Sequence, residues 1–248
     1  MPTAVHELFI DGVEDAVRSQ LKLIRYGSGG AAMFARRVQA ARSTEIHFPV
    51  GDSPANTGSK HEPDASFWHS NAQYPGIIIE VACSQKRKNL SRLAEDYLLD
   101  SDASVQVVVG LDIEYGNANS RKATLSTWRT EIFHTSDGDE LRVVQPIANE
   151  AFRDDQGNPT NHSGLRLWLM DFAYEELSRS SIENDDREIT VSAQQLCQYL
   201  SEAESRTQEE IASGDEAKYL EQEQKVAKRA AINDPDYETT STKSGSSN

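Results

Sequence analysis

Cysteine is scarce in this chain, which has 248 residues but only two cysteines, Cys83 and Cys197. Two thiols cannot build a disulfide framework, and they are too few for a zinc site with four thiolate ligands. The sequence therefore excludes a disulfide-stabilised scaffold and favours a protein of a reducing compartment.

Long apolar runs are also lacking. No stretch approaches the roughly 18 uninterrupted apolar residues that a membrane-spanning helix needs, so we expect neither a membrane span nor a membrane partner. The N-terminal segment places acidic residues among its apolar positions and lacks the basic start of a signal peptide. We therefore expect an intracellular protein, in the cytoplasm or the nucleus.

Hydrophobic residues and basic charge are both in short supply. Hydrophobic residues make up 37% of the chain and the mean hydropathy is -0.62, so part of the chain must be solvated rather than packed. The 40 acidic residues exceed the 25 basic ones, and the net charge is -15. Such acidity argues against a protein that holds nucleic acid by bulk electrostatic attraction, and any nucleic acid must then be gripped locally.

The first third of the chain has mixed periodicity. Apolar residues recur at helical spacing over residues 4–25, and a second short helix is predicted over 31–41. Alternation over 44–48 indicates a strand, and 63–68 is predicted to be another. The Pro-, Gly- and Ser-rich residues between them, 49–61, are typical of a loop.

The centre of the chain has the pattern of an α/β unit. Residues 77–83 form a continuous β-branched run, which indicates a central strand buried on both faces. A helix over 88–100 and a second buried strand over 105–113 follow, so we expect the two strands to be parallel. Strands over 123–133 and 141–147, joined by a turn signal, predict an antiparallel hairpin.

The remainder becomes more polar. A strand is predicted over 165–172, a polar linker over 178–187 and an edge strand over 189–191. Ser192 and Gln195 then make a capping box for a helix. We expect three segments: a main domain over 1–178, a linker and helical extension over 179–231, and a disordered tail over 232–248.

Three acidic residues stand on neighbouring predicted strands: Glu45, Asp64 and Glu80. Glu80 is the most informative, because an unpaired carboxylate buried in an apolar strand would cost several kcal/mol. If the second and third strands are adjacent, Asp64 and Glu80 converge and can hold one hard cation such as Mg2+.

These residues resemble a known family. A Pro-Asp pair at residues 63–64, a spacer, an apolar strand bearing Glu80, a helix and a second apolar strand are similar to the PD-(D/E)XK phosphodiesterases, which include restriction endonucleases. Within that superfamily the chain resembles nuclease-like proteins of filamentous fungi, over roughly residues 40–115. The resemblance implies a restriction-endonuclease-like α/β core, with a mixed central sheet flanked by helices and followed by the C-terminal helical extension.

The resemblance also implies an activity, metal-dependent cleavage of nucleic acid, with DNA as the expected substrate. Asp64 and Glu80 would hold Mg2+, which Mn2+ could replace, and Glu45 is a candidate third ligand. The family has a lysine two residues beyond the glutamate, where this chain has Ala82. Gln85 and Lys86 rank first as substitutes near the attacking water.

Basic residues near this strand are candidates for contacts with a phosphate backbone. They are Lys60, Lys86, Arg87, Lys88 and Arg92. A solvated helix start is the alternative interpretation of this cluster, and a structural ion pair with Arg92 or Lys88 is the alternative role for Glu80.

Three questions stay open at this point. The loss of the lysine at Ala82 keeps a second hypothesis alive, namely an inactive nuclease fold that serves as a protein- or nucleic-acid-binding scaffold. The residues do not distinguish DNA from RNA. They also leave a homodimer open.

Overall fold

The computed structural model describes residues 3–48, 59–83, 89–114, 120–136 and 138–212. The chain divides into two compact units, Met1–Ala203 and Glu204–Asn248. Only the end of one helix is described in the second unit, so the fold below is that of the first. In the described part of the chain, each helix is too short or too polar to cross a membrane.

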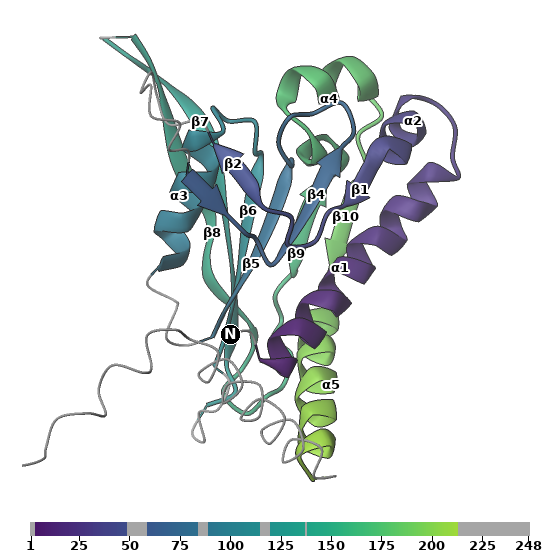
Figure 1. Cartoon of the computed structure of the whole chain (residues 1–248), viewed down its shortest axis with the longest axis vertical. Helices are drawn as coiled ribbons and strands as arrows, with labels where there is room; N and C mark the ends of the chain where they lie inside the picture. Colours follow the sequence, from purple (N-terminus) through teal and green to yellow (C-terminus); the bar gives the residue numbers. More distant parts are fainter. Residues whose placement is uncertain (1–2, 49–58, 84–88, 115–119, 137, 213–248) are drawn as a thin grey trace, which may run out of the picture. The chain divides into compact units, whose positions relative to one another are not determined.

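A six-stranded mixed sheet forms the centre of the first unit (Figure 1), in the order β1-β4-β5-β6-β7-β8. β5 and β6 are parallel, and the other neighbours in this sheet are antiparallel. The strands are β1 (Val38–Ala40), β4 (Ala65–His69), β5 (Ile77–Cys83), β6 (Val107–Ile113), β7 (Ala123–Thr135) and β8 (Gly138–Arg153). The predicted mixed α/β class is confirmed at this level.

The helix α3 (Leu90–Asp100) connects β5 to β6. The β-branched runs of both strands place them in the middle of the sheet, where each face is covered and alternate residues enter two different cores. The predictions of a parallel pair with a helical crossover, and of an antiparallel β7–β8 hairpin, are confirmed.

Helices cover the two faces of the sheet separately. The larger core contains apolar residues of α1 (Ala4–Arg25) and α2 (Gly30–Arg37), together with one alternating set from β5 and β6. The smaller core contains α3, the other alternating set and the short hairpin β2 (Ile46–Phe48)–β3 (Ser59–His61). In Figure 1, α1 and α3 accordingly lie on opposite sides of the sheet.

A second two-stranded sheet belongs to the larger core. It pairs β9 (Leu165–Trp168) with β10 (Glu188–Val191). The short helices η2 (Leu169–Phe172) and α4 (Glu175–Ile182) connect the two strands, and α5 (Ala193–Ala212) follows β10.

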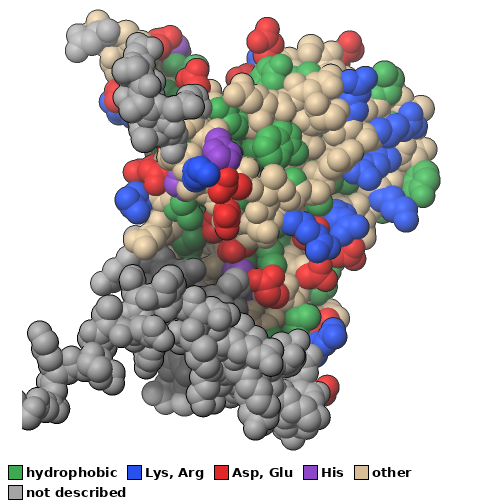
Figure 2. Space-filling view, viewed as in Figure 1, with side chains coloured by type: hydrophobic (Ala, Val, Ile, Leu, Met, Phe, Trp, Pro, Cys, Tyr) green, Lys and Arg blue, Asp and Glu red, His purple; other side chains and the backbone are tan. Residues whose placement is uncertain are grey.

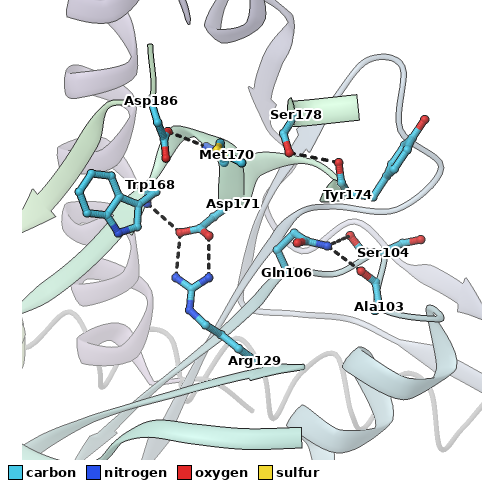
Figure 3. Close-up of polar contacts among 10 residues, drawn as sticks. All are labelled: Ala103, Ser104, Gln106, Arg129, Trp168, Met170, Asp171, Tyr174, Ser178 and Asp186. Atoms are coloured by element: carbon cyan, nitrogen blue, oxygen red, sulfur yellow. Dashed lines mark hydrogen bonds and ion pairs between the residues drawn. The ribbon is translucent and has the colours of Figure 1, made fainter. Parts of the chain in front are cut away.

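A bidentate ion pair joins this segment to the central sheet (Figure 3). The guanidinium of Arg129 on β7 donates to both carboxylate oxygens of Asp171, at 2.6 and 2.9 Å. Asp171 is buried and also accepts a bond from the backbone amide of Trp168 at 2.7 Å. The buried charge is therefore matched, which such a carboxylate requires.

Four local predictions were wrong. The strand predicted over 165–172 ends at Trp168, and Leu169–Phe172 form the short helix η2. The second helix ends at Arg37, and Val38–Ala40 pair with β4 as an edge strand. Ser59–His61, assigned to a loop, pair with β2. The predicted linker over 178–187 begins inside α4, whose Ile182 is in the main core, so the first unit extends past the expected boundary at residue 178.

The predicted capping box at the start of α5 is confirmed. The backbone amide of Gln195 donates to the Ser192 hydroxyl at 3.2 Å, and the amide of Ser192 donates to the Gln195 side chain at 3.0 Å. These bonds satisfy amides that the first turn of a helix leaves without intrahelical partners.

Candidate active site

Asp64 and Glu80 belong to neighbouring segments of the central sheet, and both line one cavity. Asp64 directly precedes β4, and the antiparallel register pairs the next residue, Ala65, with Ile79 of β5. The backbone amide of Val81 donates to Oδ2 of Asp64 at 2.7 Å, so the carboxylate is fixed against β5. The expected adjacency of these two strands is confirmed, and the structure brings the two predicted carboxylates together.

Glu80 is almost completely buried, with 8% of its surface exposed. The Tyr97 hydroxyl on α3 donates to Oε1 of Glu80 at 2.8 Å. Burial, and next the negative charge of Asp64, raise the pKa of Glu80 to about 8, although the Tyr97 bond acts in the opposite direction. Two carboxylates in such a position favour either a shared proton or a bound cation.

His6 completes the polar cluster from the first turn of α1. Its Nε2 lies 3.0 Å from Oδ2 of Asp64, and the residue is 6% exposed. Burial lowers the pKa of His6, but the hydrogen bond and charge of Asp64, aided by Glu7, outweigh it and leave the pKa raised. His6 therefore fixes the Asp64 carboxylate from the side of α1.

Sequence reasoning did not identify His6 as a site residue. The one available signal is its place beside Val5 and Phe9 on the buried side of α1, where a polar residue needs a partner. The partner is 58 positions further along the chain, so no local spacing reveals it.

The cavity has a volume of about 410 Å3 and opens beside the start of α3. Two of its lining residues, Lys60 and Arg92, are predicted phosphate contacts. The lining residues are Lys60, His61, Glu62, Asp64, Glu80, Val81, Ala82, Asn89, Leu90, Arg92, Leu93 and Tyr97. Three acids and two cations at one concave surface can hold a metal ion together with an anionic group.

Glu45, the candidate third ligand, lies outside this lining. Its exposed carboxylate pairs with Lys60 at 3.2 Å and with His47 at 2.5 Å. The hydrogen bond from Lys60 is the largest cause that lowers the pKa of Glu45. Glu45 thus acts on the cavity through the position of Lys60.

A buried alanine, Ala82, lies two residues beyond Glu80, where the sequence resemblance predicts a lysine. Ala82 lies on the same face of β5 as Glu80 and pairs in register with Asp112 of β6. Asp112 is 3% exposed, and sequence reasoning missed it, although alternation along β6 places it on this face. Glu80 pairs in register with Gly110 of β6. A Cβ atom added at Gly110 would lie 2.7 Å from the ring of Trp128, so a side chain there would collide with that ring.

Four predicted residues, Gln85, Lys86, Arg87 and Lys88, lie outside the described residues. Within the described ranges, no group of three or more His, Cys, Asp or Glu side chains is arranged to hold a metal ion. Asp64 and Glu80, two of the three acids that line the cavity, are held in place by the Val81 amide and the Tyr97 hydroxyl, and they are the candidate ligands for a cation.

Comparisons of the chain with protein-family models, with curated proteins and with solved structures found no match.

Proposed function

We propose that the protein is a metal-dependent phosphodiesterase that cleaves nucleic acid, with DNA as its substrate. The observation that carries the proposal is the carboxylate pair of buried Glu80 on β5 and half-buried Asp64 directly before β4, held at a cavity that also presents Lys60 and Arg92. The finer fold assignment, a restriction-endonuclease-like core, belongs to the same proposal and is supported by the β5–α3–β6 unit beside antiparallel β4.

The electrostatics of the pair support a divalent cation. A carboxylate with a raised pKa beside a second carboxylate gains most from a nearby positive charge, and Mg2+ or Mn2+ prefers such oxygen ligands. Bound there, the ion would polarise a phosphate oxygen and make a water molecule more acidic.

The neighbouring side chains have separate roles in this proposal. Tyr97 orients Glu80 through its hydroxyl, and His6 together with the Val81 amide orients Asp64. Lys60 on β3 and Arg92 on α3 both line the cavity, and they bind the phosphate.

The test is the substitution Glu80→Gln, measured by calorimetry with Mn2+ and by cleavage of DNA in Mg2+. Glutamine can still accept the Tyr97 bond but brings no charge, so metal binding and cleavage should both be lost while the fold remains. Glu175→Gln is the matched control, because Glu175 is an exposed acid on α4 that pairs with Arg179. Unchanged cleavage by Glu80→Gln would refute the proposal.

A second candidate function is supported by Ala82. Without the family's lysine at this position, the fold could serve as a binding scaffold that has lost its chemistry. The scaffold predicts no metal binding at millimolar Mn2+ and no cleavage by the wild-type protein. Metal binding that depends on Glu80 favours the phosphodiesterase.

A further inference from the structure

A second cavity, of about 470 Å3, lies between α1 and β1 and carries mostly positive charge. We call it the basic groove and define its cations as Arg18, Lys22, Arg25 and Arg42. Its other lining residues are Glu14, Asp15, Ser19, Gln39 and Ala40. In a chain of net charge -15, an excess of cations around one groove is a local reversal of sign.

The charge continues beyond the groove itself. Arg36 and Arg37 are exposed on α2, next to α1. Figure 2 shows Lys and Arg side chains gathered over the part of this face that Figure 1 assigns to α1, α2 and β1. A continuous basic surface of this kind suits an extended polyanion better than a single small anion.

The cations of the groove differ in the contacts that they make within the protein. Arg25 donates to the carbonyls of Ala35 and Val38 at 2.9 and 2.5 Å, so it holds α1 against α2 and β1. Lys22 is exposed to solvent. Its ammonium can therefore meet an external phosphate without loss of an internal contact.

Arg18 and Arg42 are gathered around one buried acid. Their guanidinium nitrogens lie 3.5 and 4.0 Å from Oε1 of Glu14, which is 5% exposed. These distances are longer than those of good charge-assisted hydrogen bonds, and a guanidinium has five N–H donors. Glu14 thus gathers two exposed cations at the groove and leaves donors for a ligand.

The backbone connects this groove to the Asp64–Glu80 cavity. The Ser66 hydroxyl donates to the carbonyl of Arg42 at 3.0 Å, and the amide of Ala41 donates to the carbonyl of Ser66 at 2.8 Å. Ser66 lies on β4, two residues beyond Asp64, which directly precedes that strand. Arg42 has φ of 52°, a left-handed conformation that is uncommon for residues other than glycine and occurs often at functional sites.

Helix α1 provides a second connection and a length scale. His6 bonds to Asp64 at one end, and Arg18 follows twelve residues later, about 18 Å along the helix axis at 1.5 Å per residue. One strand of a DNA duplex advances about 3.4 Å per nucleotide, so this distance corresponds to about five nucleotides.

We propose that the basic groove binds the phosphodiester backbone of nucleic acid a few nucleotides from the phosphate held at Asp64 and Glu80. This inference rests on the proposed function and assigns it a substrate-binding surface that the predicted contacts at residues 86–92 do not include. The groove provides the local positive charge that a protein of net negative charge needs to bind DNA. Each phosphate that a cation neutralises releases counterions, and this release favours binding.

The experiment measures binding of a fluorescein-labelled DNA duplex by anisotropy, in EDTA so that no cleavage occurs, across a range of salt concentrations. The double variant Arg18→Gln/Lys22→Gln should weaken binding by about tenfold or more and reduce the slope of log affinity against log salt by about 2. Arg142→Gln/Arg179→Gln is the control, since it removes the same charge from exposed ion pairs on β8 and α4.

A single variant, Lys22→Gln, protects the test against misfolding, because Lys22 is exposed and lies outside the Glu14 cluster. It should reduce the slope by about 1. The inference is overturned if the groove variants bind like the control pair, or if the protein binds phosphatidylserine vesicles through these residues and not DNA.

Two results separate this inference from the proposed function. Cleavage that depends on Glu80, with salt slopes unchanged in the groove variants, overturns the groove and leaves the phosphodiesterase. DNA binding that depends on the groove, without cleavage under any metal, supports the groove and overturns the phosphodiesterase.

Discussion

The two faces of the central sheet carry different side chains along the same pair of strands. Toward α1, the side chains of β5 and β6 that the structure describes are apolar, among them Ile79 and Val109. Toward α3, the same strands present Glu80 and Asp112 next to Ile78 and Val108. Both faces are buried, so burial alone does not separate structure from function.

The two faces differ in how their side chains affect the stability of the fold. On the α1 face, side chains contribute through packing, whose loss leaves a void. On the α3 face, the carboxylates lower stability unless a proton, a donor or a cation compensates them. A fold that keeps such groups in its central strands indicates a use for them, and substitutions at three positions can sharpen this contrast.

The largest effect is expected on the α1 face. Ile79→Ala should lower the free energy of unfolding by about 2–5 kcal/mol, and Ile79→Val by about 0.5–1.5 kcal/mol, because the core around this residue cannot collapse fully. Urea denaturation measures both. Metal affinity per folded molecule should be unchanged in the two variants, and a parallel loss of affinity would contradict the separation of the faces.

The next effect is a pH dependence that originates on the α3 face. Glu80 has a pKa of about 8 in the folded protein and the ordinary value of 4.5 when unfolded. The folded state therefore binds the proton more tightly, and stability falls as pH rises from about 4.5 to about 8, by up to about 1.4 kcal/mol per unit.

Urea denaturation in EDTA at several pH values tests this sign. The wild-type protein should lose stability across this window relative to Glu80→Gln, which has no proton to lose. Saturating Mn2+ should remove the difference in slope, because the metal takes the place of the proton. Equal slopes for the two metal-free proteins would show that Glu80 titrates normally.

The smallest effect concerns one hydroxyl on α3. Tyr97→Phe removes the donor to Glu80 and should weaken Mn2+ binding about fivefold, which corresponds to about 1 kcal/mol for one hydrogen bond. Calorimetry measures the change. Tyr74→Phe is the control, since Tyr74 lies in the same core but bonds to Gln73, and an equal loss there would indicate a general packing effect.

Much of the fold follows from local pattern. The continuous apolar runs at 77–83 and 105–113 predict central strands because a strand covered on both faces needs no polar alternation. The strands β1 and β3 were missed because each has three residues and is held by its partner's backbone rather than by its own propensity.

The sequence predicts a site residue only where its type stands out within a single strand or helix. Glu80 is identifiable because it interrupts an apolar strand, and Asp64 because it precedes the neighbouring strand. Tyr97 appears in the sequence as one more member of an apolar stripe, and nothing local reveals that its hydroxyl meets Glu80. His6 and the basic groove depend on the docking of α1, which only tertiary packing determines.

The contact between His6 and Asp64 links the first turn of α1 to a residue that lines the cavity. Helix ends fray more readily than sheet centres, and a ligand that binds only the closed form shifts that local equilibrium. Occupancy of the cavity is therefore coupled to the order of the N-terminal helix, and amide exchange at its first residues becomes a remote reporter of the ligand.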